Sequence, residues 1–197
     1  RDQHEMILSA TVRDSRAYGP NVEVRRVIQS TLGQNVIRVF DETTNRSDVE
    51  APHALMYHCN FGWPLLDEGA RLIASGRIDP WPADEQVAAP DDVEDYKRVP
   101  RPLKSHAGEG SRGFVCTPVA DRQGKAHVGL VNDKLGLAVE IEIPVEQIPR
   151  VMVWQHYGPG GMYVMGVEPM VGTPFGKDRE PDHAMALSPG QRRRTEV

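Results

Sequence analysis

The chain has 197 residues, a formal net charge of −5 and 39% hydrophobic residues. This length is sufficient for one sizeable domain with a hydrophobic core. The acidic balance argues against a general nucleic-acid surface, and no apolar run approaches the roughly 18 residues that cross a bilayer. Cys59 and Cys116 make neither a disulfide framework nor a metal-binding pattern. We therefore expect a cytoplasmic protein with two reduced thiols.

Short segments rich in β-branched residues recur between Gly, Asn and Pro residues, which predicts strands. Tight connections are expected at "LGQN" and "GPGG". The alternation in "VEIEI" is typical of a strand with one wet face. The spacing of the segments predicts an all-β fold, an antiparallel sandwich. The strands are expected at 4–13, 22–31, 35–42, 54–61, 113–120, 126–132, 137–145, 151–157 and 162–169.

Residues 62–112 depart from this pattern because they hold many of the prolines and much of the charge. They predict a long loop insertion within a single domain over 1–197, with helical turns at 83–89 and 90–98. The first residue is Arg, and a predicted strand follows within a few residues. A second strand is predicted to begin in the last residues, "QRRRTEV". We therefore expect both ends to be cuts through a larger protein.

A histidine stands inside the apolar segment 54–61. Alternation places His58, Asn60 and Met56 on one face of the predicted strand. A core face would not hold two polar groups side by side unless they were paired. His58 is therefore either a satisfied core histidine or part of a site, and both interpretations stay open at this point.

A carboxylate interrupts a second apolar segment, "YVMGVEPMVG". Glu168 shares a face with Val164 and Gly166, and it is either turned to solvent or buried with a partner. On the preceding strand, Trp154 and His156 share a face. A tryptophan beside polar groups can stack on a sugar ring, and it can equally be ordinary packing.

Other chemistry finds little support. "GTPFGK" lacks the spacing of a phosphate-binding loop and has no Ser or Thr after its lysine. Cys59 points away from His58, which argues against a Cys–His nucleophile pair. No metal and no cofactor are predicted, since the candidate ligands show no metal-binding spacing: His53, His58, Glu68, His106, His156, Glu168 and His183.

The blocks "MYHCNFGWPLLDEGARL", "YVMGVEPMVG" and "LSPGQ" together resemble the aldose 1-epimerase (galactose mutarotase-like) superfamily. The resemblance is closest to its uncharacterised bacterial branch, a domain of unknown function, and covers only the later part of that domain. It implies an antiparallel β-sandwich that binds a sugar on a concave sheet face. Members use a second histidine and an arginine from the earlier half, which are absent here unless the missing part of the domain supplies them. The partners expected from the resemblance are a small-molecule sugar and either that missing N-terminal half or a second copy in a homo-oligomer.

The same resemblance implies catalytic roles. His58 matches the general acid and Glu168 the general base, while Asn60, Asp133 and Trp154 match substrate contacts. With His156 beside Trp154, these residues predict a sugar enzyme that interconverts anomers. Acid and base are expected to flank one sugar ring without touching.

Three other interpretations remain. The chain can be a carbohydrate-binding module that lost catalysis. It can be another sugar isomerase or a lyase, assisted by a metal at His58 or Glu68. It can also be a part of a protein whose site is incomplete without the remainder. No nucleic-acid or membrane partner is expected.

Overall fold

The computed structural model describes residues 4–81, 95–108, 110–172 and 185–197. Its contacts divide the chain into two compact units, residues 1–55 with 171–197, and residues 56–170. Each unit is described by itself. Within the described ranges, no helix is long and apolar enough to span a membrane.

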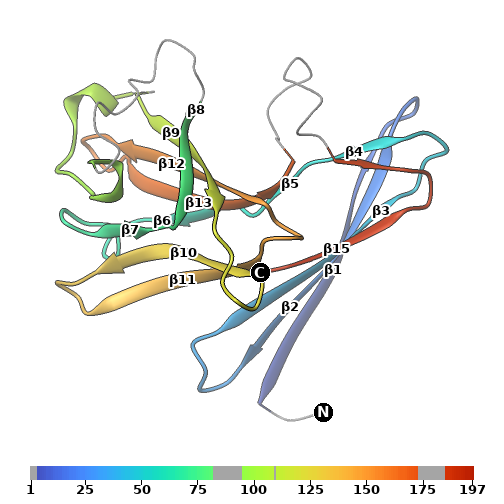
Figure 1. The fold of residues 1–197 in the computed structure, drawn as a ribbon, viewed down its shortest axis with the longest axis horizontal. Coiled ribbons are helices and arrows are strands. Elements are labelled where there is room, and N and C mark those ends of the chain that lie inside the picture. The colour runs from blue at the N-terminus through green and yellow to red at the C-terminus, as the bar shows by residue number, and fades with distance from the viewer. Residues whose placement is uncertain (1–3, 82–94, 109, 173–184) are drawn as a thin grey trace. The chain divides into compact units, whose positions relative to one another are not determined.

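The first unit contains two antiparallel sheets (Figure 1). One has four strands in the order β1-β2-β3-β15, and the other pairs β14 with β4. The strands are β1 (Glu5–Ser15), β2 (Asn21–Thr31), β3 (Ile37–Asn45), β4 (Ala51–His53), β14 (Met185–Leu187) and β15 (Arg192–Glu196). The predicted "LGQN" connection is confirmed, because it joins the antiparallel strands β2 and β3 through Gly33 with a φ of 82°.

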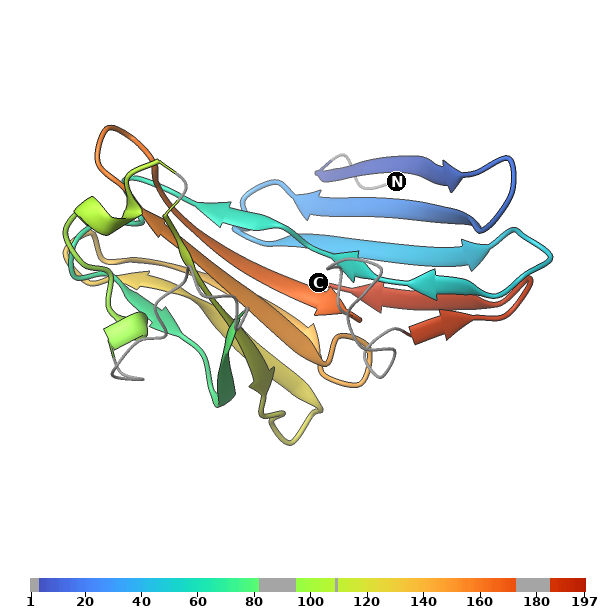
Figure 2. The same cartoon turned by 90° about the horizontal axis from the view of Figure 1, so that it is seen from above.

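The second unit is built from a six-stranded and a three-stranded sheet. The larger sheet has the order β5-β13-β12-β9-β8, with β6 also paired to β13, and β5 lies at the boundary between the units. The smaller sheet has the order β11-β10-β7, and Figure 1 shows β10 and β11 side by side below β12 and β13. Figure 2 shows the same strands from above. The elements are β5 (Leu55–Met56), β6 (Cys59–Phe61), β7 (Arg71–Ile73), β8 (Gly76–Trp81), β9 (Arg112–Pro118), β10 (Lys125–Asn132), β11 (Leu137–Pro144), β12 (Arg150–Tyr157), β13 (Tyr163–Val171) and the 3₁₀ turns η1 (Asp95–Lys97) and η2 (Lys104–His106).

Apolar side chains from one face of each sheet make the core of the second unit. Those of the larger sheet are Phe114, Cys116, Val151, Val153, Met165 and Val167. Those of the smaller sheet are Leu72, Ala126, Val128, Leu130, Ile141 and Ile143. Because side chains alternate along each strand, the other face of the larger sheet carries a different set of side chains, which includes Glu168 and Trp154. The predicted antiparallel sandwich is confirmed.

Two strands interrupt the long loop that is predicted over 62–112. Strands β7 and β8 both lie within it, and Leu72 of β7 is buried opposite Leu130 of β10. Strand β8 contains Pro80 and is the last strand of its sheet among the described residues, where a missing backbone donor is tolerated. Of the predicted helical turns, residues 83–89 lie outside the described residues, and the second is seen only as η1.

The predicted strand 54–61 is broken at its centre into β5 and β6. The Tyr57 N–H donates to the Pro169 carbonyl at 2.9 Å, and the Cys59 N–H donates back to the Tyr57 carbonyl at 2.9 Å. This local bond tightens the chain at His58. The histidine therefore lies between two strands, and its side chain is 55% exposed.

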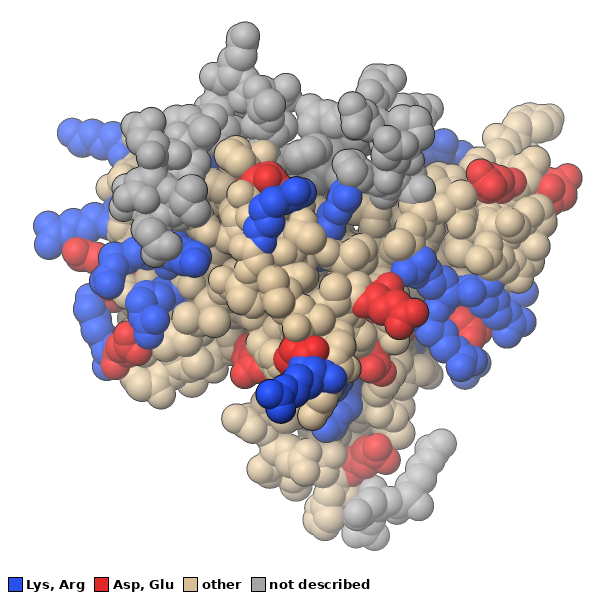
Figure 3. All heavy atoms as spheres, viewed as in Figure 1, with Lys and Arg blue, Asp and Glu red and all other residues tan. Residues whose placement is uncertain are grey.

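Basic and acidic side chains are interspersed on the face shown in Figure 3. The short basic run of β15 follows this arrangement, because Arg192 and Arg194 both pair with Glu42 of β3. Such exposed pairs contribute less than about 1 kcal/mol each to stability.

Replacing Asn45 with Ala is expected to lower the free energy of unfolding by about 2–4 kcal/mol. The Asn45 amide is fully buried, donates to the carbonyls of Val49 and Leu187 at 2.8 Å each, and accepts from the Ser47 N–H at 2.9 Å. Urea titration measures the change. The exposed Asn35→Ala variant serves as control, with an expected change below about 0.5 kcal/mol. Equal changes in both variants would contradict the assignment.

Candidate active site

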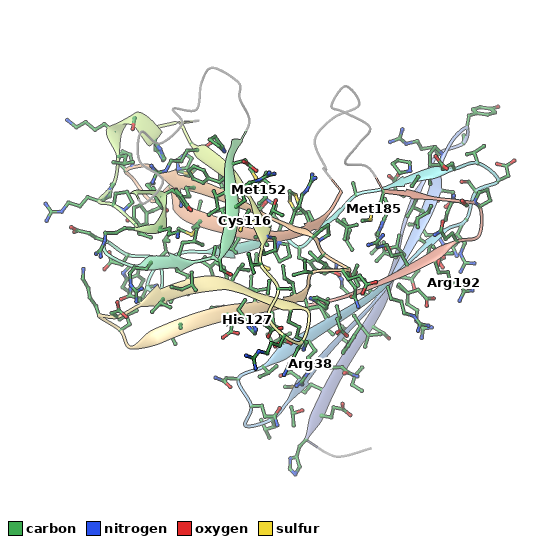
Figure 4. The ribbon with its side chains drawn as sticks, viewed as in Figure 1. Arg38, Cys116, His127, Met152, Met185 and Arg192 are labelled. Atoms are coloured by element: carbon green, nitrogen blue, oxygen red, sulfur yellow. The ribbon has the colours of Figure 1, made fainter. Side chains whose placement is uncertain are left out.

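Strand β13 carries the candidate base on the sheet face that points away from the core. Opposed residues of neighbouring antiparallel strands share a face. Glu168 stands opposite Met152 of β12, and Gly166 stands opposite Trp154 on one side and Asn60 on the other. Register thus places the side chains of β6, β12 and β13 in two rows on one face, and Figure 4 labels Met152 on β12.

His58 and Glu168 are brought into direct contact. Continuing the β6–β13 register by one residue sets His58 opposite Glu168, and their Nδ1 and Oε1 atoms lie 3.1 Å apart. The expectation that the two would flank a sugar ring without touching is therefore wrong. Opposed residues have Cβ atoms only about 4.5–5.5 Å apart, which leaves no room for a ring between them.

The two partners differ sharply in their surroundings. The Glu168 side chain is 3% exposed, whereas that of His58 is 55% exposed. Despite the short distance, none of the described groups is aligned to donate a hydrogen bond to Oε1. Burial raises the pKa of Glu168 above its ordinary value, and the neighbouring His58 ring partly offsets that rise. The buried carboxyl group with its raised pKa makes Glu168 a candidate for a functional residue.

The Glu168 carboxylate occupies space that Gly166 leaves open. A Cβ atom built on Gly166 would lie 2.1 Å from Glu168 Oε1. The carboxylate therefore lies over the glycine, in the row between Asn60 and Trp154. The structure thus brings His58, Asn60, Trp154 and Glu168 together. A glycine inside an apolar strand can indicate that another group approaches the backbone closely. Gly166 is such a glycine, and its sequence position was not interpreted in this way above.

His156 supports the tryptophan from one side. The two rings lie 5.9 Å apart between centroids. Both His156 ring nitrogens face main-chain carbonyls, Nδ1 that of Met162 at 2.8 Å and Nε2 that of Gly108 at 2.9 Å. Because both nitrogens have such partners, a direct sugar contact from His156 stays a prediction.

His106 extends this aromatic group, and no sequence pattern points to it. Its ring stacks on Tyr157 with 5.8 Å between centroids, and its Nδ1 accepts the Tyr157 N–H at 2.9 Å. Burial, and then the charge of Arg112, lower the pKa of His106. A neutral imidazole can accept that backbone bond, so His106 helps to hold the end of β12.

Asp133 lies apart from these residues. It belongs to the turn between β10 and β11, in the smaller sheet, where its carboxylate pairs with Arg71 at 3.2 Å. None of its contacts in the described ranges joins it to Glu168 or His58, so its predicted role in sugar binding gains no support from this placement.

A hollow of about 280 Å³ also lies away from the acid–base pair. Residues of β7 and η1 line it, together with their neighbours, and none of them is a predicted site residue: Arg71, Leu72, Ile73, Ala74, Lys97 and Arg98. Among the described residues of the candidate site, His58 and Asn60 are the exposed groups, whereas Glu168 and His156 are buried.

Metal ligands do not gather in the described ranges, where no group of three or more His, Cys, Asp or Glu side chains could hold an ion. Glu68, one candidate ligand, pairs with Arg101 at 3.0 Å. His183 and the "GTPFGK" segment after Gly172 lie outside the described residues.

The antiparallel sandwich matches the fold of solved galactose mutarotase-like proteins. A structure of a provisionally named aldose 1-epimerase from Klebsiella pneumoniae matches all of this chain with a TM-score of 0.86 and 22% identity. A galactose mutarotase related enzyme from Lactobacillus acidophilus matches with a TM-score of 0.62 and 16% identity. A galactose mutarotase-like protein from Clostridium acetobutylicum matches with a TM-score of 0.64 and 14% identity. The chain covers 50%, 67% and 62% of these three chains, respectively.

The chain belongs to the family described as a domain of unknown function, DUF4432, whose model matches residues 1–197. No curated protein matches it by sequence. At these identities the solved structures establish the fold and leave the reaction to be argued from the site.

Proposed function

We propose that this chain carries the acid–base pair of an aldose 1-epimerase-type enzyme, with Glu168 as general base and His58 as general acid. The observation that carries the proposal is their contact, in which a buried carboxylate with raised pKa lies 3.1 Å from an accessible imidazole. Two titratable groups held in such unlike environments are suited to opposite proton-transfer roles.

The reaction needs only proton transfers and one reversible bond cleavage. Glu168 takes the proton from the C1 hydroxyl of the cyclic sugar, the C1–O1 bond becomes a carbonyl, and the bond from C1 to the ring oxygen breaks. Protonated His58 gives its proton to that ring oxygen. After rotation about C1–C2, the ring oxygen attacks the other face of the carbonyl. Its proton returns to His58, and protonated Glu168 returns the first proton to O1.

The direct contact between the two side chains fits this chemistry. O1 and the ring oxygen are bonded to the same carbon, so the two proton-transfer groups must stand side by side. Each must reach its oxygen at about 2.6–3.2 Å. A sugar that approaches from the exposed side of His58 meets the imidazole first, with the buried Glu168 carboxylate directly beside it.

Asn60 and Trp154 are the proposed substrate contacts, because they stand on either side of Gly166. The space above Gly166, which we call the slot, holds the Glu168 carboxylate. The Asn60 amide can donate to and accept from sugar hydroxyls. The half-buried Trp154 ring offers an apolar surface to the C–H face of a sugar. Contacts from Asp133 and His156 are a weaker part of the proposal, as is a cytoplasmic location.

Polarimetry of freshly dissolved α-anomers tests the proposed activity. Neutral hexoses, uronic acids and hexose phosphates make up the panel. The rate for at least one sugar is expected to rise in proportion to protein concentration. A panel without any acceleration would overturn the proposed reaction.

A second candidate is a carbohydrate-binding module. The 3% exposure of the Glu168 side chain favours it, since a base must reach its proton. Quenching of tryptophan fluorescence by a sugar that is not epimerised would support this function. Loss of that quenching in Trp154→Phe would locate the bound sugar on the same face.

A further inference from the structure

Gly166 stands in the middle of β13 without a backbone reason to be glycine. It is absent from the glycines with positive φ, so other residues could adopt its conformation. A glycine inside a strand weakens it relative to a residue with a side chain. The reason for this glycine must therefore be the space that its missing side chain leaves.

Other strand glycines of the same unit make room for backbone. A Cβ at Gly129 would lie 2.0 Å from the Val139 carbonyl oxygen, and one at Gly76 would lie 2.1 Å from that of Thr117. At Gly166 the atoms in the way all belong to one side chain, with Glu168 Oε1 at 2.1 Å, Cδ at 3.0 Å and Cγ at 3.3 Å. The glutamate is folded back over the glycine two residues before it.

We propose that Gly166 is a positioning residue, which holds the Glu168 carboxylate against His58 by leaving its own side-chain position empty. The inference rests on the function proposed above. A methyl group at this position would drive the carboxylate out of the slot between Asn60 and Trp154, away from the 3.1 Å contact. The end of a glutamate side chain can move, whereas a strand backbone cannot, so the Gly166→Ala variant folds with a displaced base.

The kinetic test combines Gly166→Ala, Glu168→Gln and the double variant. Gly166→Ala is expected to lower kcat about 10²-fold, the usual effect of misplacing a catalytic group by about 1 Å. The double variant is expected to be no slower than Glu168→Gln, because the glycine acts only through the glutamate. A kcat for Gly166→Ala within threefold of wild type, or losses that multiply in the double variant, would overturn the inference.

A matched control comes from Gly62, which follows β6. A Cβ there meets only the Tyr163 carbonyl, at an ordinary 4.0 Å, and Gly62 also lacks a positive φ. Gly62→Ala is expected to keep the wild-type kcat. A loss in this variant equal to that in Gly166→Ala would show a general response to alanine and would overturn the inference.

The imidazole nitrogen resonances of His58 provide a test that does not require catalysis. Gly166→Ala is expected to move them in the same direction as Glu168→Gln does, and Gly62→Ala to leave them in place. If Gly166→Ala leaves them at their wild-type positions, the positioning role is overturned even if mutarotation is observed. If no sugar is epimerised but the resonances move as expected, the proposed reaction fails and the placement of Glu168 by Gly166 stands.

Discussion

Glu168→Gln is expected to slow mutarotation by about 10²–10⁴-fold, the usual contribution of a general base. The amide keeps the shape of the carboxyl group and cannot accept the proton from the C1 hydroxyl. Polarimetry on the sugar that the wild-type protein epimerises best measures the loss. The exposed Glu50→Gln variant is the control, with an unchanged rate expected.

The same substitution is expected to make the fold more stable. Burial raises the pKa of Glu168 in the folded protein, so folding favours the protonated form. The contribution of Glu168 to stability is then fully present below its unfolded-state pKa and is lost as pH rises through its folded-state pKa. A glutamine never acquires the charge, so this loss of stability does not occur in the variant, which predicts a higher Tm than wild type at neutral pH. A variant that is slower and also less stable would point to a structural role.

His58→Gln is the second substitution with a large expected effect, a fall in kcat of about 10²–10⁴-fold through loss of the general acid. It also changes Glu168. The His58 ring lowers the pKa of that carboxyl group, so its removal leaves only the burial that raises it. The residual activity of His58→Gln should therefore fall away at a higher pH than the wild-type activity does on acidification.

His127→Gln controls for the loss of an imidazole elsewhere. His127 lies on β10 in the smaller sheet, where Glu140 and Asp121 pair with it, and it is labelled in Figure 4. Its replacement is expected to leave kcat unchanged. If His58→Gln retained more than half of the wild-type kcat, the acid role of His58 would be lost.

Much of the sandwich could be predicted because its strands are local patterns. Segments such as 151–157 and 162–169 match β12 and β13 within two residues, since alternation and the intervening glycines are visible in the sequence. Short strands were missed. β4, β7 and β14 have three residues each, too few to show a period, and only pairing with distant strands defines them.

The sequence could indicate which residues form the candidate site, and it could not indicate how their side chains are arranged. Alternation identified His58 and Glu168 as polar groups on apolar strands. Their contact depends on the register of β6 against β13, which are separated by about a hundred residues, and no local pattern encodes it. Asp133 came from a loose match to the family, and it lies in the turn between β10 and β11 of the smaller sheet, so its contact with a sugar stays a prediction.

The central claim is that a buried carboxyl group, held beside an imidazole, is the base that accepts the sugar proton. The most direct test is the ¹³C titration of the Glu168 carboxyl group, compared with the acid limb of the pH profile for kcat/KM. The account predicts that both midpoints coincide and lie above about 4.3, the ordinary value for a glutamate. A Glu168 carboxyl group that titrates at the ordinary value would contradict the account. An acid limb whose midpoint differs from that of the Glu168 titration would contradict it as well.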